Sequence, residues 1–86
     1  MRRAAVSRAA VSVPSNIAEG DERNTDKDAV RFFYMAKGSL AELITQIEIA
    51  VEIGYLLPDQ VETLFSDAEK IGRMLGSLIK VRSMKT

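Results

Sequence analysis

The chain has 86 residues, balances 12 Lys and Arg against 12 Asp and Glu, and contains neither Cys nor His. This length suits one domain, and the missing residue types exclude disulfides, thiolate nucleophiles, and the commonest acid/base group and transition-metal ligand. No apolar stretch reaches the roughly 18–20 residues of a membrane-spanning helix, and the basic N-terminus lacks the apolar core of a signal peptide. We therefore expect a soluble, cytoplasmic protein.

The first segment, residues 2–20, is predicted to be a helix rich in small residues. Its apolar edge recurs at steps of four, three and four residues, at Val6, Ala10, Val13 and Ile17. Pro14 removes a backbone donor inside the segment, which predicts either a kink, the alternative we favour, or a second helix beginning there. Gly20 suits a helix C-cap. Asn16 and Glu19 lie beside the apolar edge and are expected to bond across helices or to exposed backbone near Pro14.

The central segment, residues 26–53, has apolar residues on two sides. The first set follows alternating steps of four and three, the period of a bundle seam, at Ala29, Phe33, Ala36, Leu40, Leu43, Ile47 and Ala50. A second set, Met35, Ile49 and Ile53, falls roughly 200–240° around the helix from Ile47. Such a helix is central in its fold or shared between chains. Two charged residues, Arg31 and Glu42, lie within the second set. They either form an ion pair in an interface or mark the boundary of the apolar patch.

Residues that favour helix ends bracket this central segment. Thr25 is predicted to be the N-cap, with Asp28 in the position of a capping-box acid. Gly54 suits the left-handed position that follows a helix. Gly38, in the middle of the helix, costs roughly 1 kcal/mol relative to Ala, and we interpret it as a point of close packing against a neighbouring backbone.

The last segment, residues 58–82, is predicted to be an amphipathic helix with one apolar face. Pro58 occupies the first turn, where Pro is favoured. The seam consists of Val61, Leu64, Ala68, Ile71, Leu75 and Leu78, flanked by Phe65 and Ile79. The sequence therefore predicts one all-α domain over residues 1–86, an antiparallel up-and-down bundle of three helices. The two-sided central helix calls for a fourth helix, either from another subunit or lost from the N-terminus.

Residue chemistry gives no sign of catalysis. A di-metal carboxylate bundle needs His, and no Ser, Thr, Lys or Tyr stands beside an evident base. The sequence also has no Gly-rich phosphate loop. We expect no enzyme activity, no catalytic residue, no metal and no cofactor. The candidate contacts to RNA or DNA phosphates are Arg2, Arg3 and Arg8. The alternative is that these residues form a basic end that keeps the chain soluble. The neutral net charge of the chain weighs against nucleic-acid binding.

Two stretches resemble a known family. RRAAVS at residues 2–7 with VPSNIAEG at 13–20, and RFFYMAKGSLAELITQIEIAVEIGYL at 31–56, are similar to the bacterial four-helix bundle proteins encoded within 23S rRNA intervening sequences. They also resemble the accessory variability determinant of diversity-generating retroelements. The most specific pieces are NIAEG and GSLAEL, which contain the motif's structural polar residues Asn16, Glu19 and Ser39.

The resemblance implies a helical bundle that assembles into a ring, typically a homopentamer. For the retroelement relatives it also implies binding to nucleic acid and to a reverse transcriptase. Against the family pattern, this chain begins where the second helix should, so the first helix is expected to be missing. It is also neutral where the retroelement proteins are basic.

The function predicted from the sequence is a non-enzymatic homo-oligomer that acts as an assembly or interaction module. The candidate interface consists of Met35, Ile49, Ile53, Arg31 and Glu42. The alternative is a nucleic-acid-binding accessory protein that acts on structured RNA or DNA. We expect neither a membrane nor a small-molecule substrate as a partner.

Overall fold

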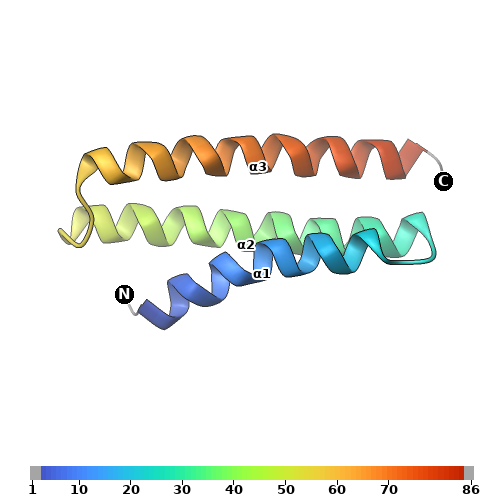
Figure 1. Cartoon of the computed structure of the whole chain (residues 1–86), viewed down its shortest axis with the longest axis horizontal. Helices are drawn as coiled ribbons and strands as arrows, with labels where there is room; N and C mark the ends of the chain where they lie inside the picture. Colours follow the sequence, from blue (N-terminus) through green and yellow to red (C-terminus); the bar gives the residue numbers. More distant parts are fainter. Residues whose placement is uncertain (1–2, 85–86) are drawn as a thin grey trace.

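A computed structural model describes residues 3–84, and from residue 8 onward it also describes the side chains. The chain forms three helices, α1 (Arg3–Asp21), α2 (Asp26–Glu52) and α3 (Pro58–Met84), joined by short turns (Figure 1). Successive helices run in opposite directions, and the described residues contain no strand. The predicted all-α class is confirmed.

Helix α2 lies between the other two helices, as Figure 1 shows, and both pack against it. Within the described residues, no Cα atom of α1 comes within 8 Å of one in α3. The Cα trace measures 45 × 22 × 13 Å. Three helices packed as a closed triangle at the usual helix spacing would give a Cα cross-section of about 12 by 14 Å. The observed cross-section of 22 by 13 Å is much wider in one direction. The helices therefore form an open V in cross-section, with α2 at the apex.

The core lies along the predicted seam of α2. Six of its seven seam residues are buried, at Ala29, Phe33, Ala36, Leu40, Ile47 and Ala50. The seventh, Leu43, is half-buried. Phe33 of α2 and Leu75 of α3 are the largest fully buried side chains of the described residues, and Val13 brings α1 into the same cluster. Burial of this apolar surface is the main force that holds the three helices together.

The seam of α3 differs from the prediction. The buried residues are Val61, Ala68, Leu75 and Ile79. Leu64, which we expected inside, is 41% exposed, and Ile71 and Leu78 are only half-buried. The physical reason is that α3 has α2 as its only close helical neighbour in the described structure, so the wider apolar face is covered along one strip only.

The ends of α2 form as the sequence predicts. Thr25 has extended backbone angles, and its Oγ1 accepts a hydrogen bond from the backbone N–H of Asp28 at 3.1 Å. At the other end, Gly54 has φ of 83°, and the N–H groups of Gly54 and Tyr55 donate to the carbonyls of Val51 and Ala50. These are the two bonds of a Schellman motif, so both ends of α2 are capped.

Two glycine interpretations were wrong. Gly20 lies inside α1, which continues to Asp21, rather than capping it. Its missing Cβ instead makes room for Phe33, since a Cβ there would stand 2.7 Å from Cε1 of that ring. Gly38, interpreted as a close-packing point, has no heavy atom within 4 Å of a Cβ built on it. Helix α1 also continues through Pro14, which excludes the alternative of a second helix beginning there.

Candidate assembly surfaces

The side of α2 that points away from the core carries three exposed apolar residues among charged ones. Met35, Ile49 and Ile53 are 47%, 42% and 54% exposed, and we call these three residues the outer face. They lie where helical geometry places them, far around α2 from Ile47, which is buried. The structure thus places these residues on one surface of the chain. Their role in an oligomer stays a prediction.

The two charged residues beside the outer face do not pair with each other. Arg31 is exposed, and its Nη2 lies 3.1 Å from Oδ1 of Asp28. Glu42 is also exposed and accepts a hydrogen bond of 3.4 Å from Nε2 of Gln46. Within the described part of the protomer Glu42 therefore has no cationic partner, and a contact from another chain would not have to break an ion pair.

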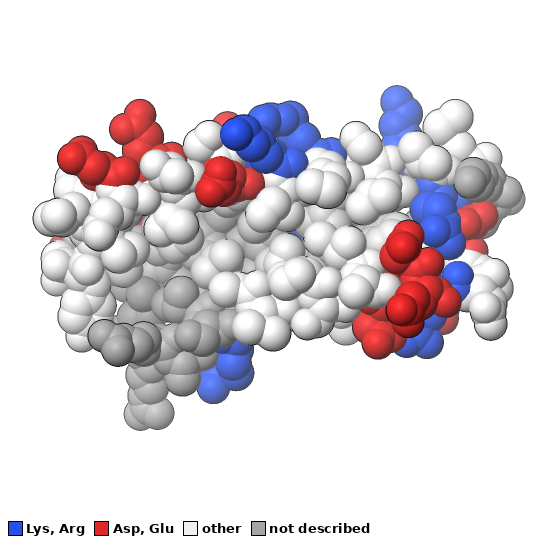
Figure 2. Space-filling model, viewed as in Figure 1, with Lys and Arg blue, Asp and Glu red and all other residues white. Residues whose placement is uncertain are grey.

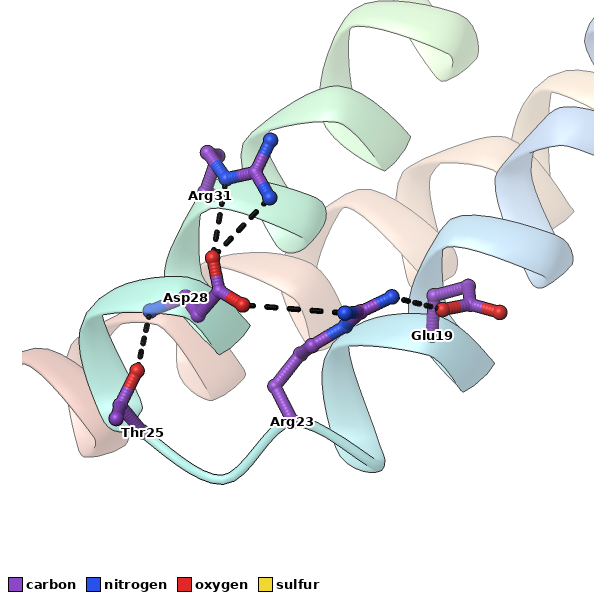
Figure 3. A network of polar contacts seen from close by, with 5 residues as sticks. All are labelled: Glu19, Arg23, Thr25, Asp28 and Arg31. Atoms are coloured by element: carbon purple, nitrogen blue, oxygen red, sulfur yellow. Dashed lines mark hydrogen bonds and ion pairs between the residues drawn. The ribbon is translucent and has the colours of Figure 1, made fainter.

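A polar network holds the corner between α1 and α2 (Figure 3). Arg23 pairs with Glu19 and lies 4.0 Å from Asp28, which also binds Arg31. The guanidinium groups of Arg23 and Arg31 lie 4.4 and 4.7 Å from the centre of the Phe32 ring. Each cation–π contact of this kind contributes roughly 0.5–1 kcal/mol at an exposed site. The network fixes the turn, and Glu19 belongs to it rather than to a contact near Pro14.

The same corner borders a cavity of about 480 Å³, lined by Glu19, Glu22, Arg23, Asn24, Thr25 and Asp28. Its lining contains no nucleophile with a base beside it. Two of its three carboxylates, those of Glu19 and Asp28, are already engaged by arginine. The arrangement can stabilise the turn through these ion pairs.

The polar residues Asn16 and Ser39 meet at Ser12, which our reasoning from the sequence did not include. The hydroxyls of Ser12 and Ser39 lie 2.7 Å apart and join α1 to α2. Asn16 Nδ2 donates to the carbonyl and the Oγ of Ser12 at 2.9 and 3.0 Å. The spacing of four residues between Ser12 and Asn16 was a usable signal, because it places both on one side of a helix.

The candidate nucleic-acid contacts are only partly described. Arg2 lies outside the described residues, and so does the side chain of Arg3. Arg8 is exposed on α1. The structure therefore describes only one of the three side chains, and their contact with nucleic acid stays a prediction.

Residues 3–84 contain no group of three or more Asp and Glu side chains placed to hold a metal ion. No helix in that range is long and apolar enough to cross a bilayer.

These features define a small all-helical protein of V-shaped cross-section that exposes several large apolar residues on its middle helix. The chain belongs to the family of 23S rRNA-intervening sequence proteins, whose model matches residues 1–77. A comparison with curated proteins finds no match. The resemblance to intervening-sequence proteins is thereby confirmed, and the further likeness to the retroelement determinant stays a prediction.

Proposed function

We propose that this protein is a homo-oligomeric assembly module, non-enzymatic and cytoplasmic, and that copies of the chain associate through the outer face of α2. The observation that carries the proposal is the exposure of Met35, Ile49 and Ile53 on a helix whose opposite side forms the core. A surface helix needs one apolar stripe, whereas α2 has two. The second stripe is explained if another copy covers it.

The apolar surface continues beyond the end of α2. Tyr55 and Leu57, in the turn that follows Ile53, are both exposed. Aromatic and large aliphatic side chains of this kind form the centres of protein–protein interfaces. The turn therefore extends the surface that an interacting copy can bury.

The free energy available from the outer face is limited. Full burial of a side chain of this size contributes roughly 1.5–3 kcal/mol, so three that are about half exposed contribute about 2–4 kcal/mol in total. Association costs roughly 4–15 kcal/mol in lost translational and rotational freedom. The outer face therefore needs a complementary apolar surface on the neighbouring copy.

The test is the mass of the protein in solution, measured by sedimentation velocity and light scattering. We expect the natural chain to be an oligomer at micromolar concentration, and the resemblance to the family favours a pentamer. Ile49→Glu should give a monomer with unchanged helix content by circular dichroism. Val11→Glu, at another exposed apolar position, is the matched control and should leave the mass unchanged. A natural chain that stays monomeric would refute the proposal.

A further inference from the structure

The methionines of the described residues all lie at the surface. Met35 on α2 is 47% exposed, and Met74 and Met84 on α3 are 54% and 76% exposed. The buried core of the described structure contains no methionine. The chain also has no Cys, His or Trp, the other side chains that are readily oxidised. An oxidant such as hydrogen peroxide therefore finds its readiest targets in exposed thioethers, none of which supports the described core.

Met35 differs from the other two methionines in its position. It belongs to the outer face of α2, together with Ile49 and Ile53. Hydrogen peroxide transfers one oxygen atom to the thioether sulfur, which loses two electrons and becomes a sulfoxide, and the peroxide leaves as water. A flexible apolar side chain thereby becomes a polar one. The reaction places a hydrogen-bond acceptor within the apolar surface that the proposed association buries. Figure 2 shows the opposite situation on α3, where uncharged and charged residues alternate along the helix.

The polar side chains one turn before and one turn after Met35 are already engaged within the chain. Nε and Nη2 of Arg31 lie 3.2 and 3.1 Å from Oδ1 of Asp28. Oγ of Ser39 lies 2.7 Å from Oγ of Ser12. Residues four apart share one face of a helix, so Arg31 and Ser39 are the polar residues that flank Met35 there. A sulfoxide oxygen on Met35 therefore needs a donor that both flanking residues already use elsewhere, and burying such a group unpaired is unfavourable.

We propose that oxidation of Met35 to its sulfoxide is a switch that turns self-association off. This switch rests on the self-association proposed above and regulates the same surface. Oxidation acts on the separated chain, in which Met35 is exposed, and assembly shields the sulfur. A methionine sulfoxide reductase reverses the change: two thiols are oxidised to a disulfide, and the oxygen leaves as water. The chain stays folded in both states, because the described core contains no methionine.

Peroxide treatment of the natural chain tests the switch. Peptide mass spectrometry measures the fraction of Met35 that carries an added oxygen, and sedimentation velocity measures the assembly. Because an unpaired buried polar group weakens binding about tenfold or more, complete oxidation of Met35 should raise the dissociation constant by about that factor. Circular dichroism should show unchanged helix content. Treatment with methionine sulfoxide reductase should restore the original assembly.

Two matched variants separate Met35 from the other methionines. Met35→Leu keeps a side chain of similar volume without the sulfur, so it should assemble like the natural chain and stay assembled after peroxide. Met74→Leu removes an exposed methionine outside the outer face and should remain as sensitive as the natural chain. If peroxide dissociates Met35→Leu as fully as the natural chain, the effect comes from other residues and the inference is overturned.

The rate of oxidation gives a second measurement that needs no substituted chain. If assembly shields Met35, its oxidation should slow as the chain concentration is raised through the dissociation constant. Oxidation of Met84, which is exposed near the end of α3, should keep the same rate. A constant rate at Met35 in a chain that assembles would contradict the proposed shielding.

The results distinguish this switch from self-association itself. If the natural chain assembles, and assembles equally well once Met35 is fully oxidised, the switch is wrong and the proposed function stands. If the natural chain is monomeric before any peroxide is added, the proposed function is refuted and the switch with it.

Discussion

Gly20 of α1 lies close against α2, and Gly20→Ala tests how tightly the two helices pack. A Cβ at this position would lie 2.7 Å from Cε1 and 2.9 Å from Cδ1 of Phe33, and 3.0 Å from the carbonyl oxygen of Ala29. Carbon atoms in contact prefer about 3.5–4.0 Å. The Phe33 ring is 1% exposed, so it has no free space to rotate into, and the Ala29 oxygen belongs to a helix backbone.

Two opposing effects set the magnitude of the Gly20→Ala change. The substitution gains about 1 kcal/mol of helix propensity, since Gly20 lies within α1. Overpacking a rigid core costs typically 1–3 kcal/mol, and contacts on two sides place this site in the upper part of that range. We expect a net loss of about 1–2 kcal/mol in the free energy of unfolding.

Urea unfolding followed by circular dichroism measures this loss. All variants are compared at one fixed protein concentration, because the proposed association would also stabilise the fold. Gly38→Ala is the matched control, since a Cβ there meets no atom within 4 Å. It should gain about 1 kcal/mol from helix propensity alone. If both variants are equally stabilised, the close approach of α1 to Phe33 is refuted.

Two further substitutions probe single contacts in the same assay. Thr25→Ala removes the side-chain cap of α2 and should lower the free energy of unfolding by about 1 kcal/mol, whereas Thr25→Ser should keep it. Arg82→Met removes the ion pair with Asp26 that ties the end of α3 to the start of α2. Both side chains are at least three-quarters buried, so we expect the free energy of unfolding to fall by about 1 kcal/mol. Arg73→Met, which removes an exposed ion pair with Glu69, is the control. If the two variants lose the same free energy, the expected contribution of the Arg82–Asp26 pair is contradicted.

The seam of α2 was predictable because its periodicity depends only on the helix itself. A helix covered by neighbours on one side must bury residues at steps of three and four, and Phe33, Ala36 and Leu40 obey this rule. The caps at Thr25 and Gly54 were predictable for the same reason, since each bond forms within a few residues along the chain.

The seam of α3 was not predictable at the same level. Its sequence shows an apolar face wide enough for two neighbours, but the number of neighbours depends on how the other helices are placed. Only α2 lies against it in the described structure, so Leu75 is fully buried while Leu64 remains exposed. Periodicity identifies residues that can be buried, and tertiary arrangement decides which of them are.

The glycines and the Ser12–Ser39 contact show a second limit of the sequence. Whether a glycine allows close approach depends on which side chain of another helix lies opposite, and this follows from the register between α1 and α2. In this register Phe33 lies opposite Gly20, Ser39 lies opposite Ser12, and Gly38 faces open space. No local pattern in either helix specifies that register.

Folding and the association that we propose depend on the same helix but on different side chains. Ile47 is 5% exposed in the seam, while Ile49, two residues later, is 42% exposed on the outer face. Because successive helical residues are rotated by about 100°, two positions move a side chain from the core to the opposite surface. Substitutions at Ile49 can therefore abolish association and leave the protomer folded, whereas substitutions at Ile47 must lower the stability of the protomer before they affect its contacts with other copies.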